Sequence, residues 1–144
     1  MKAIIFFSNS KKHFSKNVAK DIEGDHFEIE NLGKKIKFIV FQMIYFGYIT
    51  VFNKPVKTNN LAIDFEKYDE IVLVSPVWAG RACAFMKQLL LDNQFKDKQV
   101  TIIATAGGMN KKYFSSFDNL IDKSNNVEKH MMYVKDKIIY ERSV

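Results

Sequence analysis

The strongest constraint on the fold is the repeated succession of short apolar runs and segments with helical spacing. The first run, residues 2–7, is almost uninterrupted, which is typical of a parallel strand buried on both faces. Further strands are predicted at residues 26–32, 68–75, 99–105 and 127–134, and helices at residues 14–22, 81–91 and 113–121. Because strands and helices alternate with short connections, the sequence predicts an α/β fold, a three-layer, doubly wound parallel sheet of five strands.

The length and the charge of the chain limit the kind of protein that it forms. The 144 residues are enough for one ordinary domain and too few for two, so residues 1–144 are expected to form a single domain. The net charge of +6 indicates a solvated, lysine-rich surface or attraction to an anionic partner, such as a phosphate-bearing cofactor or an acidic protein. A nucleic-acid partner is not predicted, because the chain has no long Lys/Arg run, zinc-finger motif or aromatic RNA-binding motif.

Two features favour a cytoplasmic location. Cys83 is the single cysteine, so the chain cannot form an internal disulfide, which fits a reducing compartment. Met1 and Lys2 lead directly into the first apolar run, and no small-residue cleavage site of a secretory signal follows.

The segment at residues 36–52 is unusually apolar and aromatic. A transmembrane helix needs about 20 mainly apolar residues. This run is shorter and contains Lys37, Gln42, Gly47 and Thr50, so no membrane span is predicted. We expect a helix that packs on the sheet; the alternative is a face for self-association or for a membrane surface.

The first of three loops at the carboxyl ends of the predicted strands is rich in serine and lysine. Ligands of open α/β sheets bind at this edge, where the strand order reverses. Ser8, Ser10 and Ser15 precede a helix, and hydroxyls and free N–H groups there suit a phosphate. Taken alone, the loop fits a serine-capped helix with a lysine-rich turn equally well or better. It has no glycine, so NAD or ATP is not expected as the tightly bound ligand.

The second loop, residues 75–81, holds the only tryptophan of the chain. Trp78 is predicted to lie between a strand and a helix, where its indole suits stacking on a flat aromatic ligand, and Gly80 allows close approach of the backbone. The alternative is a tryptophan lid over the end of the sheet without a ligand. The third loop, residues 105–110, contains a glycine pair with free N–H groups, which is a weak signal by itself.

Residues 6–10 with 15–19, residues 68–80 and residues 104–108 together resemble the flavodoxin family, in particular the short flavodoxin-like proteins of bacteria. The resemblance implies the strand order 2-1-3-4-5 and one non-covalently bound FMN. It implies that the phosphate contacts Ser8, Ser10 and Ser15, and we add Lys11 and Lys12 of the same loop as candidate contacts. It further implies that the isoalloxazine contacts residues on two sides: Pro76, Val77, Trp78, Ala79 and Gly80 on one, and Thr105, Ala106, Gly107 and Tyr113 on the other.

The chain departs from the family pattern in three places. The family's phosphate loop resembles Ser-x-Thr-Gly-Asn-Thr, but here Lys11 stands for the glycine and the loop is longer. Lys11 and Lys12 either compensate with charge or mark a loop that has lost phosphate affinity. Residues 82–84 lack the proline that relatives often carry. Ten residues follow Val134, so the last helix is expected to be short or absent, and an uncovered sheet face would favour a homodimer.

The predicted function is that of a redox protein that transfers electrons through FMN to a partner protein or a small-molecule acceptor. Two alternatives stay open: an FMN-dependent NAD(P)H:quinone or nitro reductase, and a flavodoxin-fold interaction module without FMN. No catalytic residue is predicted, because the flavin performs the electron chemistry. No metal site is predicted, because the three histidines are scattered and the single cysteine gives no ligand spacing.

Overall fold

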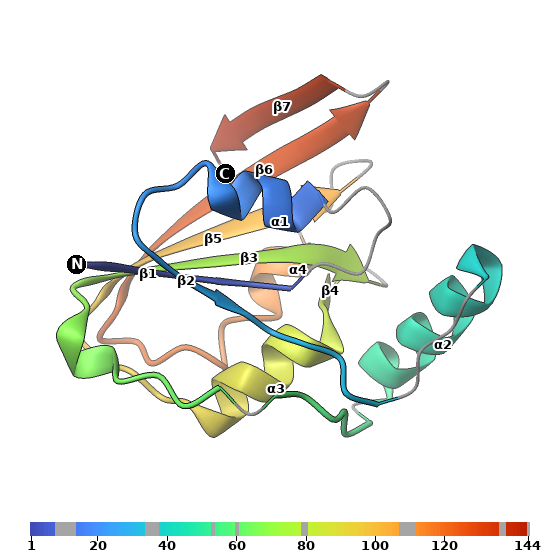
Figure 1. Cartoon of the computed structure of the whole chain (residues 1–144), viewed down its shortest axis with the longest axis horizontal. Coiled ribbons are helices and arrows are strands. Elements are labelled where there is room, and N and C mark those ends of the chain that lie inside the picture. The colour runs from blue at the N-terminus through green and yellow to red at the C-terminus, as the bar shows by residue number, and fades with distance from the viewer. Residues whose placement is uncertain are drawn as a thin grey trace.

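A parallel sheet carries the architecture, and the order of its strands confirms the predicted fold (Figure 1). The computed structural model describes residues 1–7, 14–33, 38–52, 54–59, 61–78, 81–106, 112–135 and 138–143. For Phe14, Ile39, Met43, Trp78, Ala106, Lys112 and residues 131–143 it describes the backbone alone. The strands are β1 (Lys2–Phe6), β2 (Asp25–Glu28), β3 (Glu70–Trp78), β4 (Arg81–Ala82), β5 (Gln99–Ala106), β6 (Asn126–Lys135) and β7 (Ile138–Ser143). The helices are α1 (Phe14–Lys20), α2 (Ile39–Val51), α3 (Ala84–Asp92) and α4 (Lys112–Ser115), with a short 3₁₀-helix at Phe65–Lys67.

The strand order is β2-β1-β3-β5-β6-β7, and the first five strands of this order are parallel. In chain order these are the five predicted strands, arranged as 2-1-3-4-5. The additional β7 is antiparallel to β6 and forms where a last helix would begin; Val134, for example, pairs with Ile139. An antiparallel partner satisfies the backbone edge of β6, which would otherwise be open.

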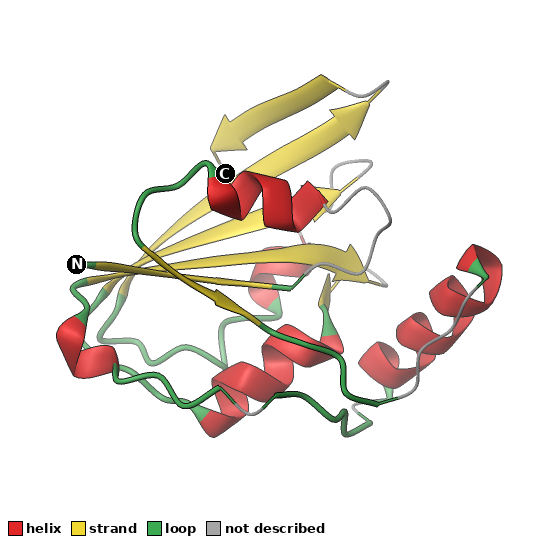
Figure 2. Cartoon of the chain, in the orientation of Figure 1, coloured by secondary structure: helices red, strands yellow, loops and turns green. Residues whose placement is uncertain are grey.

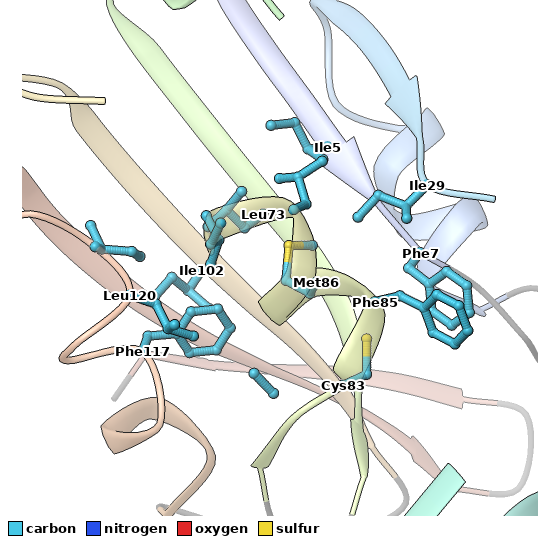
Figure 3. Packing of buried hydrophobic residues seen from close by; sticks show 14 of the residues in the cluster. Ile5, Phe7, Ile29, Leu73, Cys83, Phe85, Met86, Ile102, Phe117 and Leu120 are labelled. Carbon is cyan, nitrogen blue, oxygen red and sulfur yellow. The ribbon is translucent and has the colours of Figure 1, made fainter. Parts of the chain in front are cut away.

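Two apolar cores lie on opposite faces of the sheet because neighbouring side chains of a strand point to opposite faces (Figure 2). Figure 3 shows Ile5, Leu73 and Ile102 in the larger core, which α3 and the α4 region cover. Their neighbours Ile4 and Val72 belong to the smaller core under α1. Burial of each such side chain stabilises the fold by about 2 kcal/mol.

Polar residues mark the part of the α1 face that carries no helix among the described residues. Glu128 pairs in register with Thr101, and His130 pairs with Ile103 on β5, so both side chains share the face of the smaller core. Nε2 of His130 lies 3.7 Å from Oε2 of Glu128. Because these β6 residues are polar, burial of this area by a helix would gain less than burial of the apolar residues under α1.

Three predicted elements differ from the structure. The predicted helix at residues 81–91 begins later, at Ala84, because Arg81 and Ala82 pair with the end of β3 as β4. Trp78 is therefore the last residue of β3, and its predicted place in a loop is wrong. The predicted helix at residues 113–121 is helical only to Ser115 and continues in turns. Its apolar positions are nevertheless buried as predicted: Tyr113, Phe114, Phe117, Leu120 and Ile121.

The apolar segment at residues 36–52 contains α2, which packs on the body of the protein by one face. Phe46 and Ile49 are buried, and the Phe46 ring lies edge-on to Phe85 of α3 at a centroid distance of 6.1 Å. On the other side Phe41 and Ile44 are 60% and 65% exposed. The predicted helix therefore exists and joins the larger core through Phe46 and Ile49, but it does not cover the sheet as predicted, because most of its described apolar side chains are exposed.

Candidate cofactor site at the carboxyl edge of the sheet

The carboxyl ends of β1, β3 and β5 lie side by side at one edge of the sheet. Phe6 pairs in register with Val74, and Pro76 pairs with Thr105. The chain passes from β1 to β2 on one side and places β3 on the other, so the strand order reverses between β1 and β3 (Figure 1). The three loops that follow these strands thus leave from neighbouring positions, which is the usual position of a ligand crevice in an open α/β sheet.

Several predicted contact residues lie outside the described part of the chain. They are Ser8, Ser10, Lys11, Lys12, Ala79, Gly80 and Gly107, and their contacts stay predictions. Trp78 and Ala106 are placed by their backbone, as the last residues of β3 and β5. The described side chains of the predicted set are Ser15, Pro76, Val77, Thr105 and Tyr113. Of these, Pro76 and Val77 are half-buried at the end of β3, and Val77 packs against the larger core.

A buried hydroxyl pair joins α1 to β5 on one face of this edge. Oγ of Ser15 lies 2.7 Å from Oγ1 of Thr105, and the two side chains are 2% and 6% exposed. Each hydroxyl carries one hydrogen, and the bond between the two oxygens uses one of them. The second hydrogen remains available to an acceptor such as a phosphate or carbonyl oxygen. The pair therefore forms a structural link between α1 and β5, and its predicted contact with a cofactor stays a prediction.

A second hydroxyl pair lies on the opposite face of the same edge. The Tyr113 hydroxyl lies 2.5 Å from Oγ of Ser75, and both residues are fully buried. Burial raises the pKa of Tyr113 above its ordinary value of 10.0, although the bond to Ser75 lowers it in part. Tyr113 therefore keeps its proton at neutral pH and holds the end of β3. Its predicted contact with the ring of a cofactor stays a prediction.

The strand pair that ends in Trp78 is held in place by the α4 region. Trp78 pairs with Arg81 across the antiparallel β3–β4 connection. The backbone N–H of Ala82 donates to Oγ of Ser116 at 2.9 Å, and this hydroxyl donates to the carbonyl oxygen of Tyr113 at 2.5 Å. These bonds fix the backbone that carries Trp78 relative to the buried tyrosine.

An aromatic stack fixes the end of β1, where the serine-rich loop begins. The rings of Phe7 and Phe85 lie 4.4 Å apart between centroids and 15° from parallel (Figure 3). The backbone N–H of Phe7 also donates to the carbonyl oxygen of Val74 at 3.1 Å. An offset aromatic pair adds about 1 kcal/mol to the gain from burial. The first loop therefore starts from a rigid position beside β3.

Sequence reasoning missed Ser75 and Ser116 as residues that shape this edge. Ser75 carried a usable signal, because it is the first polar residue after the buried run of residues 71–74. Ser116 carried no such signal, because serines in polar stretches are common on protein surfaces. Its role depends on the hydrogen bond to Ala82 of β4, which only the folded chain forms.

The described part of the chain also has two hollows outside the predicted contact residues. One of about 460 Å³ lies beside α2 and includes Gly33, Tyr45, Lys57 and Phe85 in its lining, and one of about 340 Å³ lies beside α3. Neither lining contains a predicted contact residue. Within the described ranges, no group of three or more His, Cys, Asp or Glu side chains is placed to hold a metal ion.

The described contact residues of the edge are suited to binding rather than to acid–base chemistry. Ser15, Thr105, Ser75 and Tyr113 are uncharged side chains that offer hydroxyl donors and acceptors. Cys83, at the start of α3, is fully buried, and burial raises the pKa of its thiol to about 12. At neutral pH it is a thiol that packs in the larger core.

No protein-family model matches the sequence, and no curated protein matches it. Among solved structures, the chain is similar to a flavoprotein of Lactobacillus acidophilus in complex with FMN, with 20% identity, 90% of this chain and 91% of that chain covered, and a TM-score of 0.68. It is also similar to two proteins assigned as flavoproteins. The one from Bacteroides eggerthii has 13% identity, 89% and 84% coverage and a TM-score of 0.68. The one from Bacteroides uniformis has 17% identity, 89% coverage of both chains and a TM-score of 0.67. At these identities the likeness shows a shared fold, and it confirms the predicted flavodoxin-like architecture.

Proposed function

We propose that this chain binds one FMN non-covalently at the carboxyl ends of β1, β3 and β5 and acts as an electron-transfer protein. The observation that carries the proposal is the reversal of strand order between β1 and β3. Ligands of open α/β sheets bind at such a reversal, and in flavodoxin, which has this strand order, the ligand there is FMN. The shared fold with the L. acidophilus flavoprotein, whose structure holds FMN, supports the same cofactor here.

The hydrogen-bonding groups at this edge fit a phosphorylated flavin. The Ser15–Thr105 pair retains one hydroxyl hydrogen, and a phosphate oxygen accepts from such donors. In sequence, Lys11 and Lys12 lie between β1 and this pair and supply positive charge without a glycine-rich loop. We assign the phosphate to this side of the crevice.

The end of β3 is the proposed support for the ring. Trp78, with Pro76 and Val77, ends the strand beside the reversal, and the bonds from Ala82 and Ser116 hold its backbone. An indole provides a broad, rigid surface for a flat ring. The half-buried Val77, next to Trp78 in the strand, would help to exclude water from the proposed position of the ring. Thr105 and Ala106 at the end of β5 would close the other side.

Bound FMN supplies the electron chemistry, and the residues of this chain position it. Because the described contact residues are uncharged, electron transfer to a partner protein or a small acceptor needs no acid or base from them. A carrier needs no more than this, whereas a reductase must also bind NAD(P)H and a second substrate.

The first experiment measures flavin binding. The protein as purified is expected to show a flavin absorption band in the visible range, and the apoprotein to quench added FMN fluorescence more strongly than that of riboflavin, which lacks the phosphate. Replacing Ser10 and Ser15 together by Ala should weaken FMN affinity about tenfold or more. Ser124→Ala, just before β6 at the opposite edge, should leave it unchanged. A colourless protein that also rejects added FMN would assign the chain to the class of interaction modules instead.

The second experiment separates a carrier from a reductase. FMN-loaded protein reduced chemically should pass its electrons to ferricyanide, and it should show no sustained oxidation of NADPH with a quinone or a nitro compound present. Many turnovers of NADPH oxidation would contradict the carrier assignment and favour the reductase, while leaving the FMN site in place.

A further inference from the structure

The exposed face of α2 is the most apolar surface among the described helices. Five of its apolar side chains are exposed, and so is Phe52 directly after its end; the five are Val40, Phe41, Ile44, Tyr48 and Val51. At 100° per residue they fall within about 120° of the helix circumference, opposite the face that holds Phe46 and Ile49. The helix is thus apolar on nearly all sides, a composition that fits a helix with a partner on each face.

The net positive charge of the chain is concentrated, in sequence, in the segment that contains this helix. Residues 38–52 contain no charged side chain, and residues 31–63 contain five lysines (Lys34, Lys35, Lys37, Lys54 and Lys57) and no Asp or Glu. Removing these five from the 22 basic residues leaves 17 against 16 acidic residues in the rest of the chain. This segment therefore accounts for five of the six net positive charges.

We propose that the exposed face of α2 docks on an anionic membrane surface. The apolar stripe would enter the boundary between headgroups and acyl chains, and the lysines on both sides of the helix in sequence would meet lipid phosphates and carboxylates. Lys54 already lies over the Tyr48 ring, with Nζ 5.9 Å from the centroid. A tyrosine and a lysine with a long apolar stem are side chains that suit this boundary.

The position and length of α2 agree with a helix that lies on a membrane. Figure 1 shows α2 standing out from the body of the protein, on the side to which the arrowheads of β3 and β6 point. Its 13 residues correspond to a length of about 20 Å. Among the described residues there is no helix with the length and apolar character needed to cross a bilayer.

A second copy of the chain is a poorer occupant of this face. In a symmetric pair the α2 helices would run either parallel or antiparallel. Both arrangements bring lysine-rich ends together, and residues 31–63 offer no carboxylate to neutralise them. Like charges at close range oppose such a pair, whereas an anionic bilayer neutralises every one of them. The inference does not depend on FMN binding.

The test uses the full chain and vesicles of phosphatidylcholine with phosphatidylserine in a ratio of about seven to three, compared with pure phosphatidylcholine. We expect sedimentation with the mixed vesicles, little with the pure ones, and release at about 1 M NaCl, where the Debye length is about 3 Å. Phe41→Gln with Ile44→Gln should weaken binding about tenfold or more, because both side chains lose their apolar burial. Each of Lys54→Gln and Lys57→Gln should weaken it about fivefold.

The matched control is Leu91→Gln on α3, which removes another exposed apolar side chain of 54% exposure and should bind as the unchanged chain does. Circular dichroism and thermal unfolding verify that each variant is folded. The proposal is overturned if the chain does not sediment with the mixed vesicles, or if it sediments equally well with vesicles of pure phosphatidylcholine. It is likewise overturned if Leu91→Gln weakens vesicle binding as much as the Phe41/Ile44 double substitution does. A further result would also overturn it: the unchanged chain is a dimer in solution that binds no vesicles, and the Phe41/Ile44 variant is a monomer.

Discussion

The hydroxyl oxygens of Ser15 and Thr105 lie 2.7 Å apart although 90 residues separate them in the chain. The bond joins the first turn of α1 to the end of β5, across the two strands whose order reverses. It therefore sets the width of the edge at which we place the cofactor, independently of the loops that follow the strands.

This relationship predicts a coupling between the two residues. Ser15→Ala and Thr105→Val should each lower the free energy of unfolding by about 1–2 kcal/mol, because each leaves a buried hydroxyl without its partner. The double variant should cost less than the sum by about 1 kcal/mol, since no orphaned hydroxyl then remains. Urea unfolding of the four proteins without FMN measures this, and strict additivity would show that the bond contributes nothing.

The second pair, Ser75 and Tyr113, predicts a similar asymmetry. Tyr113→Phe keeps the ring in the core but leaves Oγ of Ser75 buried and unpaired, so the free energy of unfolding should fall by about 1–3 kcal/mol. Adding Ser75→Ala to Tyr113→Phe should recover part of that loss. The midpoint of urea unfolding measures both effects. If Tyr113→Phe caused only a packing defect, the added Ser75→Ala would not raise the free energy of unfolding again.

The buried thiol of Cys83 predicts a loss of stability in alkali. Burial raises its pKa from 9.0 to about 12, so above pH 9 the folded chain keeps a proton that the unfolded chain releases. Stability is thus complete below pH 9 and falls by up to about 1.4 kcal/mol per pH unit above it. Between pH 9 and 10 the fall of the unfolding free energy with pH should be smaller in Cys83→Ala than in the unchanged chain. Tyr113 does not obscure this difference, because it contributes to the fall only above its ordinary pKa of 10.0.

Thiol reagents provide an independent check on Cys83. In the native protein at pH 8 the thiol should react far more slowly than in urea, because it is fully buried and protonated. Rapid native labelling, or an alkaline slope that Cys83→Ala leaves unchanged, would contradict this assignment.

The one-sided packing of α2 predicts opposite outcomes for two of its phenylalanines. Phe46→Ala should lower the free energy of unfolding by about 3–5 kcal/mol, because the ring is 4% exposed and contacts Phe85. Phe41→Ala, at 60% exposure, should change it by less than about 0.5 kcal/mol. Thermal unfolding of the two variants measures the difference, and equal losses would mean that the outer face is buried in the isolated chain.

The sequence predicted the parallel sheet well because residues 3–7, 71–74 and 102–104 are apolar runs whose neighbouring side chains are buried on both faces. It placed Trp78 in a loop because the antiparallel pairing with Arg81 is a tertiary contact that no local pattern encodes. The strand at β7 was unforeseen for the same reason, since its partner on β6 decides its form. Periodicity could not show that α2 packs by one face only, because both faces are apolar. For the cofactor site, the serine and tryptophan positions predict the carboxyl edge of the sheet, and that site stays a prediction, whereas the hydroxyl pairs depend on contacts between distant residues.

The central claim, that FMN binds at the carboxyl ends of β1, β3 and β5, is tested most directly by a titration of the isotope-labelled full chain with FMN, followed through its backbone amide NMR signals. The account predicts that the largest shifts fall on residues 8–15, 77–81 and 105–113, with little change around Gly33 and Lys57 beside the larger hollow. Shifts that cluster at Gly33 and Lys57, or signals that do not move at an excess of FMN, would contradict it.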